Sequence, residues 1–173
     1  MKNMENSQEN INLSFSDNFF SREEHEIIYD YCINNKNYIF GEKDTGNGTP
    51  PTGFVNEIPE THLVCKIMNT ILRERVEFIR DMKLMRIYVN CFAPRENGYF
   101  HTDGDCVTFL YYPNLEQYDI DEGGETKFLV NGNVQGILPV PNRMVIFDGN
   151  IKHSATGFRN HHRFTVAIKY SSR

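Results

Sequence analysis

Short apolar segments separated by polar turns fill the second half of the chain. Six of them are rich in β-branched and aromatic residues: LMRIYVNCFA (84–93), VTFLYYP (107–113), GETKFLV (124–130), GILPV (136–140), RMVIFD (143–148) and RFTVAIKY (163–170). Segments of this length and composition are typical of β-strands. A succession of such strands after two helices predicts an antiparallel barrel or sandwich with the helices on one side.

Two helices are predicted before these strands. Ser21 and Glu24 have the spacing of a capping box, and apolar residues follow at helical intervals, which predicts a helix over 22–35. Pro59 can start a second helix, which is predicted to extend over 59–80 with one face buried. The predicted fold class is therefore α+β, mainly β, with N-terminal helices flanking a β core.

The other segments lack this periodicity. Residues 1–10 are polar and predicted to form a disordered tail, and residues 11–20 are interpreted as a strand and a turn. Residues 41–57 predict a long loop, for which a functional lid and a plain surface excursion both remain open. No repeat or low-complexity linker divides the chain, so residues 11–173 are predicted to form a single domain.

Composition narrows the class of protein. The 173 residues are 39% hydrophobic and 13% aromatic, which suits a folded core. The net charge of -5 gives no general attraction to nucleic acid or to a membrane surface, and no apolar run approaches the length of a membrane span. The four cysteines are widely spaced and no secretory signal is seen, which predicts reduced thiols and a cytoplasmic protein.

The segment FHTDGD contains a candidate pair of metal ligands, His101 and Asp103. In an extended segment, residues two apart point to the same side. His153 follows an apolar strand and a turn and is the strongest candidate for a third ligand, whereas His161 and His162 lie in a polar run. Two histidines and one carboxylate form the ligand set of non-haem Fe(II) oxygenases. An isolated H-x-D motif is weak evidence, so the interpretation depends on the rest of the chain.

A candidate anion-binding residue, Arg163, lies ten residues after His153. Alternation along RFTVAIKY places Arg163, Thr165 and Lys169 on one face and the large apolar residues on the other. A buried guanidinium needs an anion, and a carboxylate held by two hydrogen bonds is its natural partner. Tyr112, in VTFLYYP, can add a phenol donor. The alternative is an arginine paired with an acidic side chain at the rim of a barrel.

In this order and spacing, the collected segments resemble the Fe(II)/2-oxoglutarate-dependent oxygenases, and within them the prolyl 4-hydroxylase-like group. The resemblance covers about half of the chain, with the segments HTD, VTFLYYPN, EGGETKF, PNRMVIFDGNIKH and RFT. It implies a double-stranded β-helix, or jelly-roll, core with flanking helices.

The resemblance also implies the roles of the site residues. His101, Asp103 and His153 would ligate the metal and form the catalytic centre. The residues implied to hold 2-oxoglutarate or line its pocket are Arg163, Tyr112, Thr165, Tyr88 and Thr126. The cofactors implied are Fe(II), 2-oxoglutarate as cosubstrate and O2, and ascorbate stays open as an accessory reductant. Because Asp103 is present, a halogenase variant is not expected.

Several functions remain open at this point. The first is a hydroxylase that acts on a C–H bond, with a prolyl residue of a peptide or protein as the leading substrate. The second is an oxygenase of a free amino acid, a nucleoside or another small molecule. From other classes, a non-catalytic jelly-roll binding module and a cupin-type hydrolase or isomerase stay in view. The predicted partners are 2-oxoglutarate and an unidentified small-molecule or peptide substrate, without a membrane and with nucleic acid not indicated.

Overall fold

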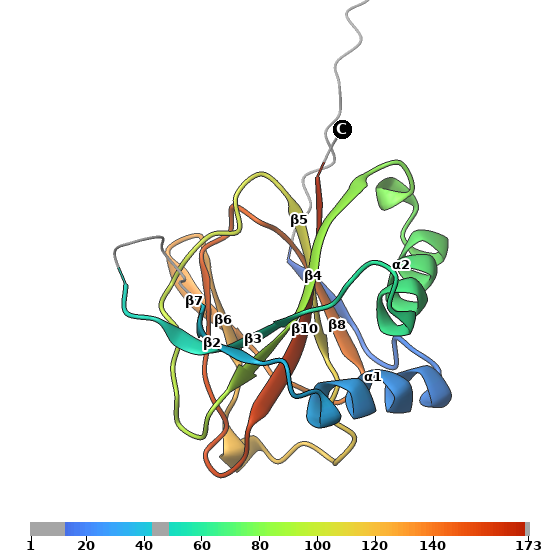
Figure 1. The fold of residues 1–173 in the computed structure, drawn as a ribbon. Coiled ribbons are helices and arrows are strands. Elements are labelled where there is room, and N and C mark those ends of the chain that lie inside the picture. Colours follow the sequence, from blue (N-terminus) through green and yellow to red (C-terminus); the bar gives the residue numbers. More distant parts are fainter. Residues whose placement is uncertain (1–12, 43–48, 172–173) are drawn as a thin grey trace, which may run out of the picture.

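The computed structural model describes residues 13–42 and 49–171. In chain order the elements are β1 (Ser14–Ser16), α1 (Arg22–Asn34), β2 (Ile39–Glu42), β3 (Thr52–Glu57), α2 (Leu63–Arg75), η1 (Glu77–Ile79), β4 (Lys83–Phe92), β5 (Val107–Tyr112), η2 (Ile120–Glu122), β6 (Thr126–Val130), β7 (Asn133–Ile137), β8 (Arg143–Asp148), β9 (His153–Ala155) and β10 (Arg163–Ser171). The larger antiparallel sheet has the order β1-β8-β5-β10-β4-β3-β2, and the smaller has the order β7-β6-β9. Both helices lie on one side of the strands (Figure 1).

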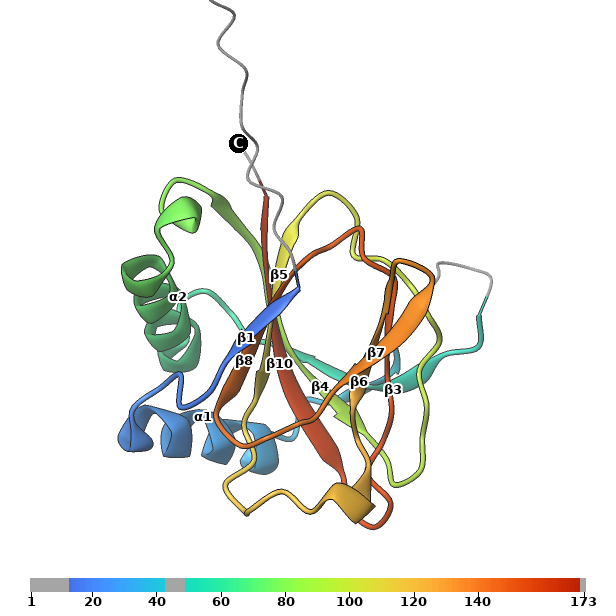
Figure 2. The same ribbon diagram turned by 180° about the vertical axis from the view of Figure 1, so that it is seen from behind.

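Two apolar cores hold these layers together. One lies between the sheets and includes Phe128 from β6 and Phe147 from β8. The other lies between the larger sheet and the helices and includes Leu72 from α2 and Ile168 from β10. The view from behind shows the smaller sheet and the helices on opposite sides of the larger sheet (Figure 2). This arrangement confirms the predicted jelly-roll class with helices on one side.

Strand β10 separates the two cores, as the alternation of its residues predicts. Val166, Ile168 and Tyr170 point toward the helices and are fully buried. Arg163 and Thr165 lie on the other face and line a cavity between the sheets. The apolar face of β10 therefore fixes the strand, and its polar face is left for a site.

The predicted capping box of the first helix is confirmed. The Glu24 N–H donates to the Ser21 hydroxyl (3.3 Å), and the Ser21 N–H donates to the Glu24 carboxylate (2.8 Å). The predicted second helix over 59–80 is too long at both ends, because α2 begins at Leu63 and ends at Arg75, and only the short η1 follows. His62 is the N-cap, with its ring accepting from the Val64 N–H, and Arg73 donates to the carbonyls of Ile79 and Met82 in the segment after the helix.

The prediction of a loop over 41–57 is wrong at both ends. β2 and β3 form a hairpin at the edge of the larger sheet, where Phe54 of β3 lies opposite Phe40 of β2 and Cys91 of β4. Cross-strand pairing supports these strands despite their turn-rich sequence. Residues 43–48 and the predicted tail 1–10 lie outside the described residues.

Two strands of the smaller sheet, β7 and β9, differ from the sequence prediction. The segment predicted as a strand over 136–140 is β7, which begins at Asn133 and ends at Ile137. Asn131 and Gly132 both have positive φ (50° and 77°), which is the geometry of a tight two-residue hairpin turn and moves the strand toward the N-terminus. β9 is too short to give a periodic pattern and was not predicted as a strand.

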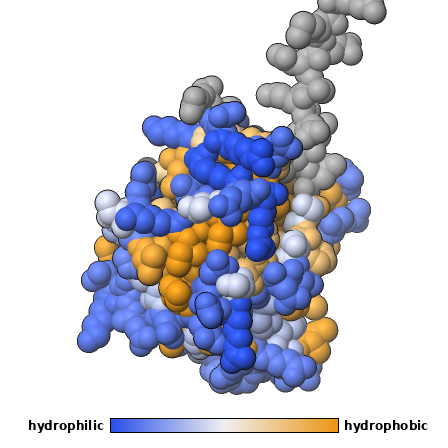
Figure 3. Space-filling view, turned by 90° about the vertical axis from the view of Figure 1, so that its right-hand side faces the viewer, coloured by the Kyte–Doolittle hydropathy of each residue, from blue (hydrophilic) through white to orange (hydrophobic). Residues whose placement is uncertain are grey.

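The outer surface beside α2 is mixed in character. Figure 3 views the molecule from this side and shows hydrophilic residues surrounding an apolar area. Inside the same layer, α2 buries Val64, Met68 and Leu72 against the sheet, which explains its amphipathic pattern. Within the part of the chain that the structure describes, we find no helix with the length and apolarity needed to cross a membrane.

Asn142 connects the segment before α1 to the larger sheet. It has a left-handed backbone (φ 60°), and its side chain is buried. Its Oδ1 accepts from the Phe20 N–H (2.9 Å) and from the Tyr111 hydroxyl (3.0 Å), while its Nδ2 donates to the Phe20 carbonyl (2.8 Å). One amide thus satisfies three buried polar groups: the Phe20 N–H, the Phe20 carbonyl and the Tyr111 hydroxyl.

We expect Asn142→Ala to lower the free energy of unfolding by about 3 kcal/mol, because it leaves buried hydrogen-bonding groups without partners. Urea denaturation followed by circular dichroism measures the change. Asn131→Ala is the matched control, since Asn131 also has positive φ but is exposed. An equal loss of stability in both variants would mean that the backbone conformation, and not the hydrogen bonds, carries the effect.

Candidate metal centre

Backbone pairing brings His101, Asp103 and His153 together. His101 and His153 form an isolated antiparallel bridge, with N–H···O distances of 3.0 Å and 2.9 Å. The Asp103 N–H donates to the Gly149 carbonyl (2.7 Å), in the turn before β9. Position 149 requires glycine, because a Cβ there would lie 2.5 Å from the Gly104 carbonyl oxygen. The close approach of these two turns places the three side chains side by side.

Backbone carbonyls orient both imidazole rings. His101 Nδ1 lies 3.0 Å from the Tyr99 carbonyl oxygen, and His153 Nδ1 lies 2.9 Å from that of Ile151. Since a carbonyl oxygen only accepts, each Nδ1 carries a proton and each Nε2 keeps its lone pair. The two Nε2 atoms lie 3.8 Å from the carboxylate oxygens of Asp103. Three donor atoms, one from each residue, lie within 4.8 Å of one another and could hold a metal ion.

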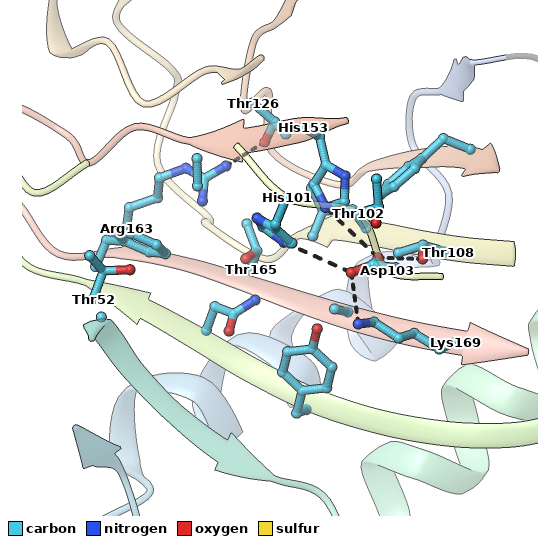
Figure 4. A pocket seen from close by; sticks show the side chains of 18 of the residues that line it. Thr52, His101, Thr102, Asp103, Thr108, Thr126, His153, Arg163, Thr165 and Lys169 are labelled. Atoms are coloured by element: carbon cyan, nitrogen blue, oxygen red, sulfur yellow. Dashed lines mark hydrogen bonds and ion pairs between the residues drawn. The ribbon is translucent and has the colours of Figure 1, made fainter. Parts of the chain in front are cut away.

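The Asp103 carboxylate is held from both sides. Lys169 Nζ donates to Oδ1 (2.8 Å), and the Thr108 hydroxyl donates to Oδ2 (2.6 Å), as Figure 4 shows. Its side chain is only 4% exposed. The carboxylate therefore cannot rotate freely, and its orientation is set before any ion binds.

The charges of the triad suit a metal ligand set. Burial alone would raise the pKa of Asp103, but the attraction of His153 and Lys169 and the hydrogen bonds from Lys169 and Thr108 bring that pKa below its usual value. Burial lowers the pKa of His153 and outweighs the opposite effect of Asp103. Asp103 thus favours its ionised form and His153 its neutral form, the states in which these two side chains bind metals.

Arg163 lies at the inner end of the same cavity, buried to 1% exposure. Its Nε donates to the Gly124 carbonyl (2.7 Å), and its Nη2 donates to the Thr126 hydroxyl (2.7 Å). Among the described residues, none of the ion pairs joins Arg163 to an acidic side chain. The alternative of an arginine paired at a barrel rim therefore does not hold for the described residues: Arg163 lines the cavity, and the charge of Glu125 acts on it only from beyond ion-pair distance.

Thr126 joins the two predicted anchor residues. Its hydroxyl oxygen accepts from Arg163 and also from the Tyr112 hydroxyl (2.8 Å). Thr126 and Thr165 line the cavity, but Tyr112 does not belong to its wall. Tyr112 acts on the site through Thr126, and the guanidinium lies over its ring (5.5 Å to the centroid). Thr126, which the resemblance implied as a pocket residue, thus lies in the cavity wall and contacts both Arg163 and Tyr112.

The cavity that joins the two ends has a volume of about 160 Å³. Tyr88 lines it, as predicted, together with Thr108 and Lys169, which the sequence interpretation did not assign to a role. The alternation along the two strands could have identified them: Thr108 lies on the cavity face of VTFLYYP, and Lys169 lies on the cavity face of RFTVAIKY. Thr52 of β3 also lines the cavity, so part of the predicted loop is a wall of the site.

Three other polar residues that could compete for a ligand role lie outside the triad. Asp105 is exposed and accepts a hydrogen bond from Asn150 (3.2 Å). His161 and His162 are exposed and line a second hollow, between the segment after β5 and the start of β10. Among the described residues, the cluster that could hold a metal ion is the predicted set of His101, Asp103 and His153.

Comparisons with known proteins identify the fold. No protein-family model matches the sequence, and no curated protein matches it. Among solved structures, a prolyl-4-hydroxylase from Pseudomonas putida is similar with a TM-score of 0.77 and 14% identity, over 94% of this chain and 94% of that one. A prolyl hydroxylase from Trichoplax adhaerens, in complex with a hypoxia inducible factor peptide fragment, has a TM-score of 0.73 and 15% identity, over 92% and 83%.

A third solved structure, HygX from Streptomyces hygroscopicus with nickel and 2-oxoglutarate bound, has a TM-score of 0.69 and 11% identity, over 93% of this chain and 83% of that one. The sequence identity to these structures is low, while the arrangement of strands and helices is similar over nearly the whole length of this chain. The chain therefore has the jelly-roll fold of the prolyl 4-hydroxylase-like 2-oxoglutarate/Fe(II) oxygenase structures.

Proposed function

We propose that the chain is an Fe(II)- and 2-oxoglutarate-dependent dioxygenase that hydroxylates a C–H bond, and that residues 11–173 form its single domain. The observation that carries this proposal is the content of one cavity. A His-Asp-His triad lies in its wall, and the same cavity is lined by a buried arginine that forms no ion pair with an acidic side chain of the described residues. A hydrolase or a binding module has no need for both features together.

The residues fit the groups that the proposal requires. Two imidazole nitrogens and one carboxylate form the facial donor set preferred by Fe(II), which leaves positions open for other ligands. Arg163 offers a guanidinium in a water-poor pocket, where a carboxylate is bound most strongly. The hydroxyls of Thr126 and Thr165 line the same region and can complete the contacts to a dicarboxylate.

Each part of the site then has a task. Iron with 2-oxoglutarate supplies the activation of O2 that oxidises the substrate. Lys169 and Thr108 hold Asp103 in place, and the carbonyls behind the imidazoles fix the tautomers of His101 and His153. Thr126 holds the guanidinium of Arg163 in position, and the cavity walls keep water from the reacting groups.

For the substrate, we propose a prolyl residue of a peptide or protein first and a small molecule second. Two of the similar structures are prolyl hydroxylases, one of them with a bound peptide fragment. The small-molecule alternative rests on HygX, which has been solved with hygromycin B bound. The fold accommodates both kinds of substrate, so a direct assay has to choose between them.

The proposed function is tested by incubating the purified protein with Fe(II), 2-oxoglutarate and O2. We expect iron-dependent release of succinate, which a chelator suppresses and which a true substrate accelerates. Peptides, amino acids and nucleosides are then screened by mass spectrometry for the gain of one oxygen atom, because the other atom of O2 enters succinate. If the protein neither binds 2-oxoglutarate in the presence of the metal nor forms succinate, the proposal is wrong.

A further inference from the structure

Lys169 places a second cationic group in the cavity, at the far end from Arg163. Both residues lie on the same face of β10, six positions apart, which corresponds to about 20 Å of strand. Figure 4 shows the triad between them, with Arg163 at one end of the pocket and Lys169 at the other. The proposed function uses Arg163 for the cosubstrate and gives Lys169 only its contact with Asp103.

The charges in the cavity do not balance when both cofactor and cosubstrate are present. Among the described residues that line the cavity, Arg163 and Lys169 are the basic ones and Asp103 is the acidic one. A divalent metal ion and dianionic 2-oxoglutarate cancel each other. Asp103 compensates one of the two basic side chains, so one positive charge is left over. An uncompensated charge in a buried site is unfavourable, and an anion that enters removes the cost.

Lys169 is the group on which this charge is available. An ammonium has three N–H donors: Asp103 Oδ1 accepts one of them at 2.8 Å, and the Tyr88 hydroxyl is a second hydrogen-bond partner. The Lys169 side chain is 15% exposed and opens onto the cavity, unlike the fully buried Arg163. Once a metal ion shares the charge of Asp103, the ammonium loses much of its compensation and has one donor left for another acceptor.

Neutral donors surround this position. Tyr88 and Asn90 lie on β4, beside β10, and line the same cavity. The Lys169 ammonium lies 5.4 Å from the centre of the Tyr88 ring. The corner formed by these three side chains is thus polar and cationic without containing an acidic group besides Asp103.

We propose that Lys169 forms a subsite for an anionic oxyacid group of the substrate, a carboxylate or a phosphate, beside the metal triad and away from Arg163. This inference rests on the proposed function, and it narrows the substrates to molecules or peptides that carry a negative charge close to the oxidised carbon. A neutral prolyl ring without such a group would leave the subsite empty.

The test uses protein loaded with Mn(II) and saturated with 2-oxoglutarate, so that no turnover is needed. The probes are acetate and its neutral isostere acetamide, and the measured quantity is the relaxation of their methyl protons by the metal. We expect acetate to be relaxed roughly tenfold more strongly than acetamide, because a charged hydrogen bond holds it close to Mn(II). Lys169→Met is expected to reduce acetate to the level of acetamide, and Lys169→Arg to retain most of the excess.

Lys152→Met is the matched control, since Lys152 is exposed and lies outside the cavity wall, and it should behave as the unchanged protein. Methyl phosphate, measured in parallel, separates the two oxyacids: the probe with the stronger effect identifies the preferred group. The proposal is overturned if acetate and acetamide behave alike, or if the acetate excess survives in Lys169→Met, which would mean that the metal binds acetate directly. Calorimetry of 2-oxoglutarate on the same samples reports separately on the proposed function.

Discussion

Asp103→Ala is expected to weaken Mn(II) binding by at least about a hundredfold and to abolish succinate formation. The substitution removes the only anionic donor of the triad and leaves Lys169 as an uncompensated cation at the place where a divalent ion would bind. Attraction is thereby replaced by repulsion in a buried site. Metal binding is measured by electron paramagnetic resonance of free Mn(II), and turnover by mass spectrometry of succinate.

Asp105→Ala is the matched control for this prediction. It removes the same functional group two residues away, but Asp105 is exposed and contacts Asn150 instead of the histidines. It should leave metal binding and turnover unchanged. If the two variants lose metal to the same extent, the ligand assignment is wrong and the acidity of the segment as a whole matters.

A loss of folding in Asp103→Ala has to be separated from a loss of the site. Removing one partner of a buried ion pair is destabilising, because the other charge remains buried. The double variant Asp103→Ala, Lys169→Met removes both charges and is expected to recover most of the stability in urea without recovering metal binding. Recovery of metal binding in the double variant would contradict the role of Asp103 as a ligand.

The candidate metal ligands could be predicted from the sequence because their signal is local or follows strand order. His101 and Asp103 are two residues apart, and His153 comes directly after a recognisable strand and turn. The hydrogen bonds that make the triad rigid could not be predicted in this way. Thr108 and Lys169 reach Asp103 from β5 and β10, and their contact exists only after these strands pair in register.

The same contrast between local patterns and long-range contacts explains the errors in the predicted fold. The strands with strong alternation, such as β5, β8 and β10, were predicted nearly to the residue. The segment between β2 and the middle of β3 is rich in turn residues, and β3 becomes a strand because β4 offers an edge for pairing, on which β2 then adds. The apolar spacing continues past the end of α2, so helical periodicity does not reveal that the helix stops at Arg75; the contacts of Arg73 with the carbonyls of Ile79 and Met82 appear only in the structure.

Arg163→Met is expected to weaken 2-oxoglutarate binding by roughly a hundredfold while metal binding stays within a factor of about two. Methionine fills much of the same space without charge, so the cavity keeps its shape and loses its anion-binding group. Calorimetry with Mn(II)-loaded protein measures the affinity, and the concentration of 2-oxoglutarate that gives half-maximal succinate release is expected to rise in parallel.

Two further variants decide how Arg163 acts. Arg159→Met removes an exposed arginine from the turn before β10 and should leave 2-oxoglutarate binding unchanged. Thr126→Val keeps the guanidinium but removes the hydroxyl that holds it and that Tyr112 contacts, so an intermediate loss is expected. If Thr126→Val weakens binding while Arg163→Met does not, the hydroxyls and not the guanidinium bind the cosubstrate. Arg163, Arg159 and Thr126 are not members of the metal triad. An equal loss of metal binding in all three variants would therefore indicate a general collapse of the cavity.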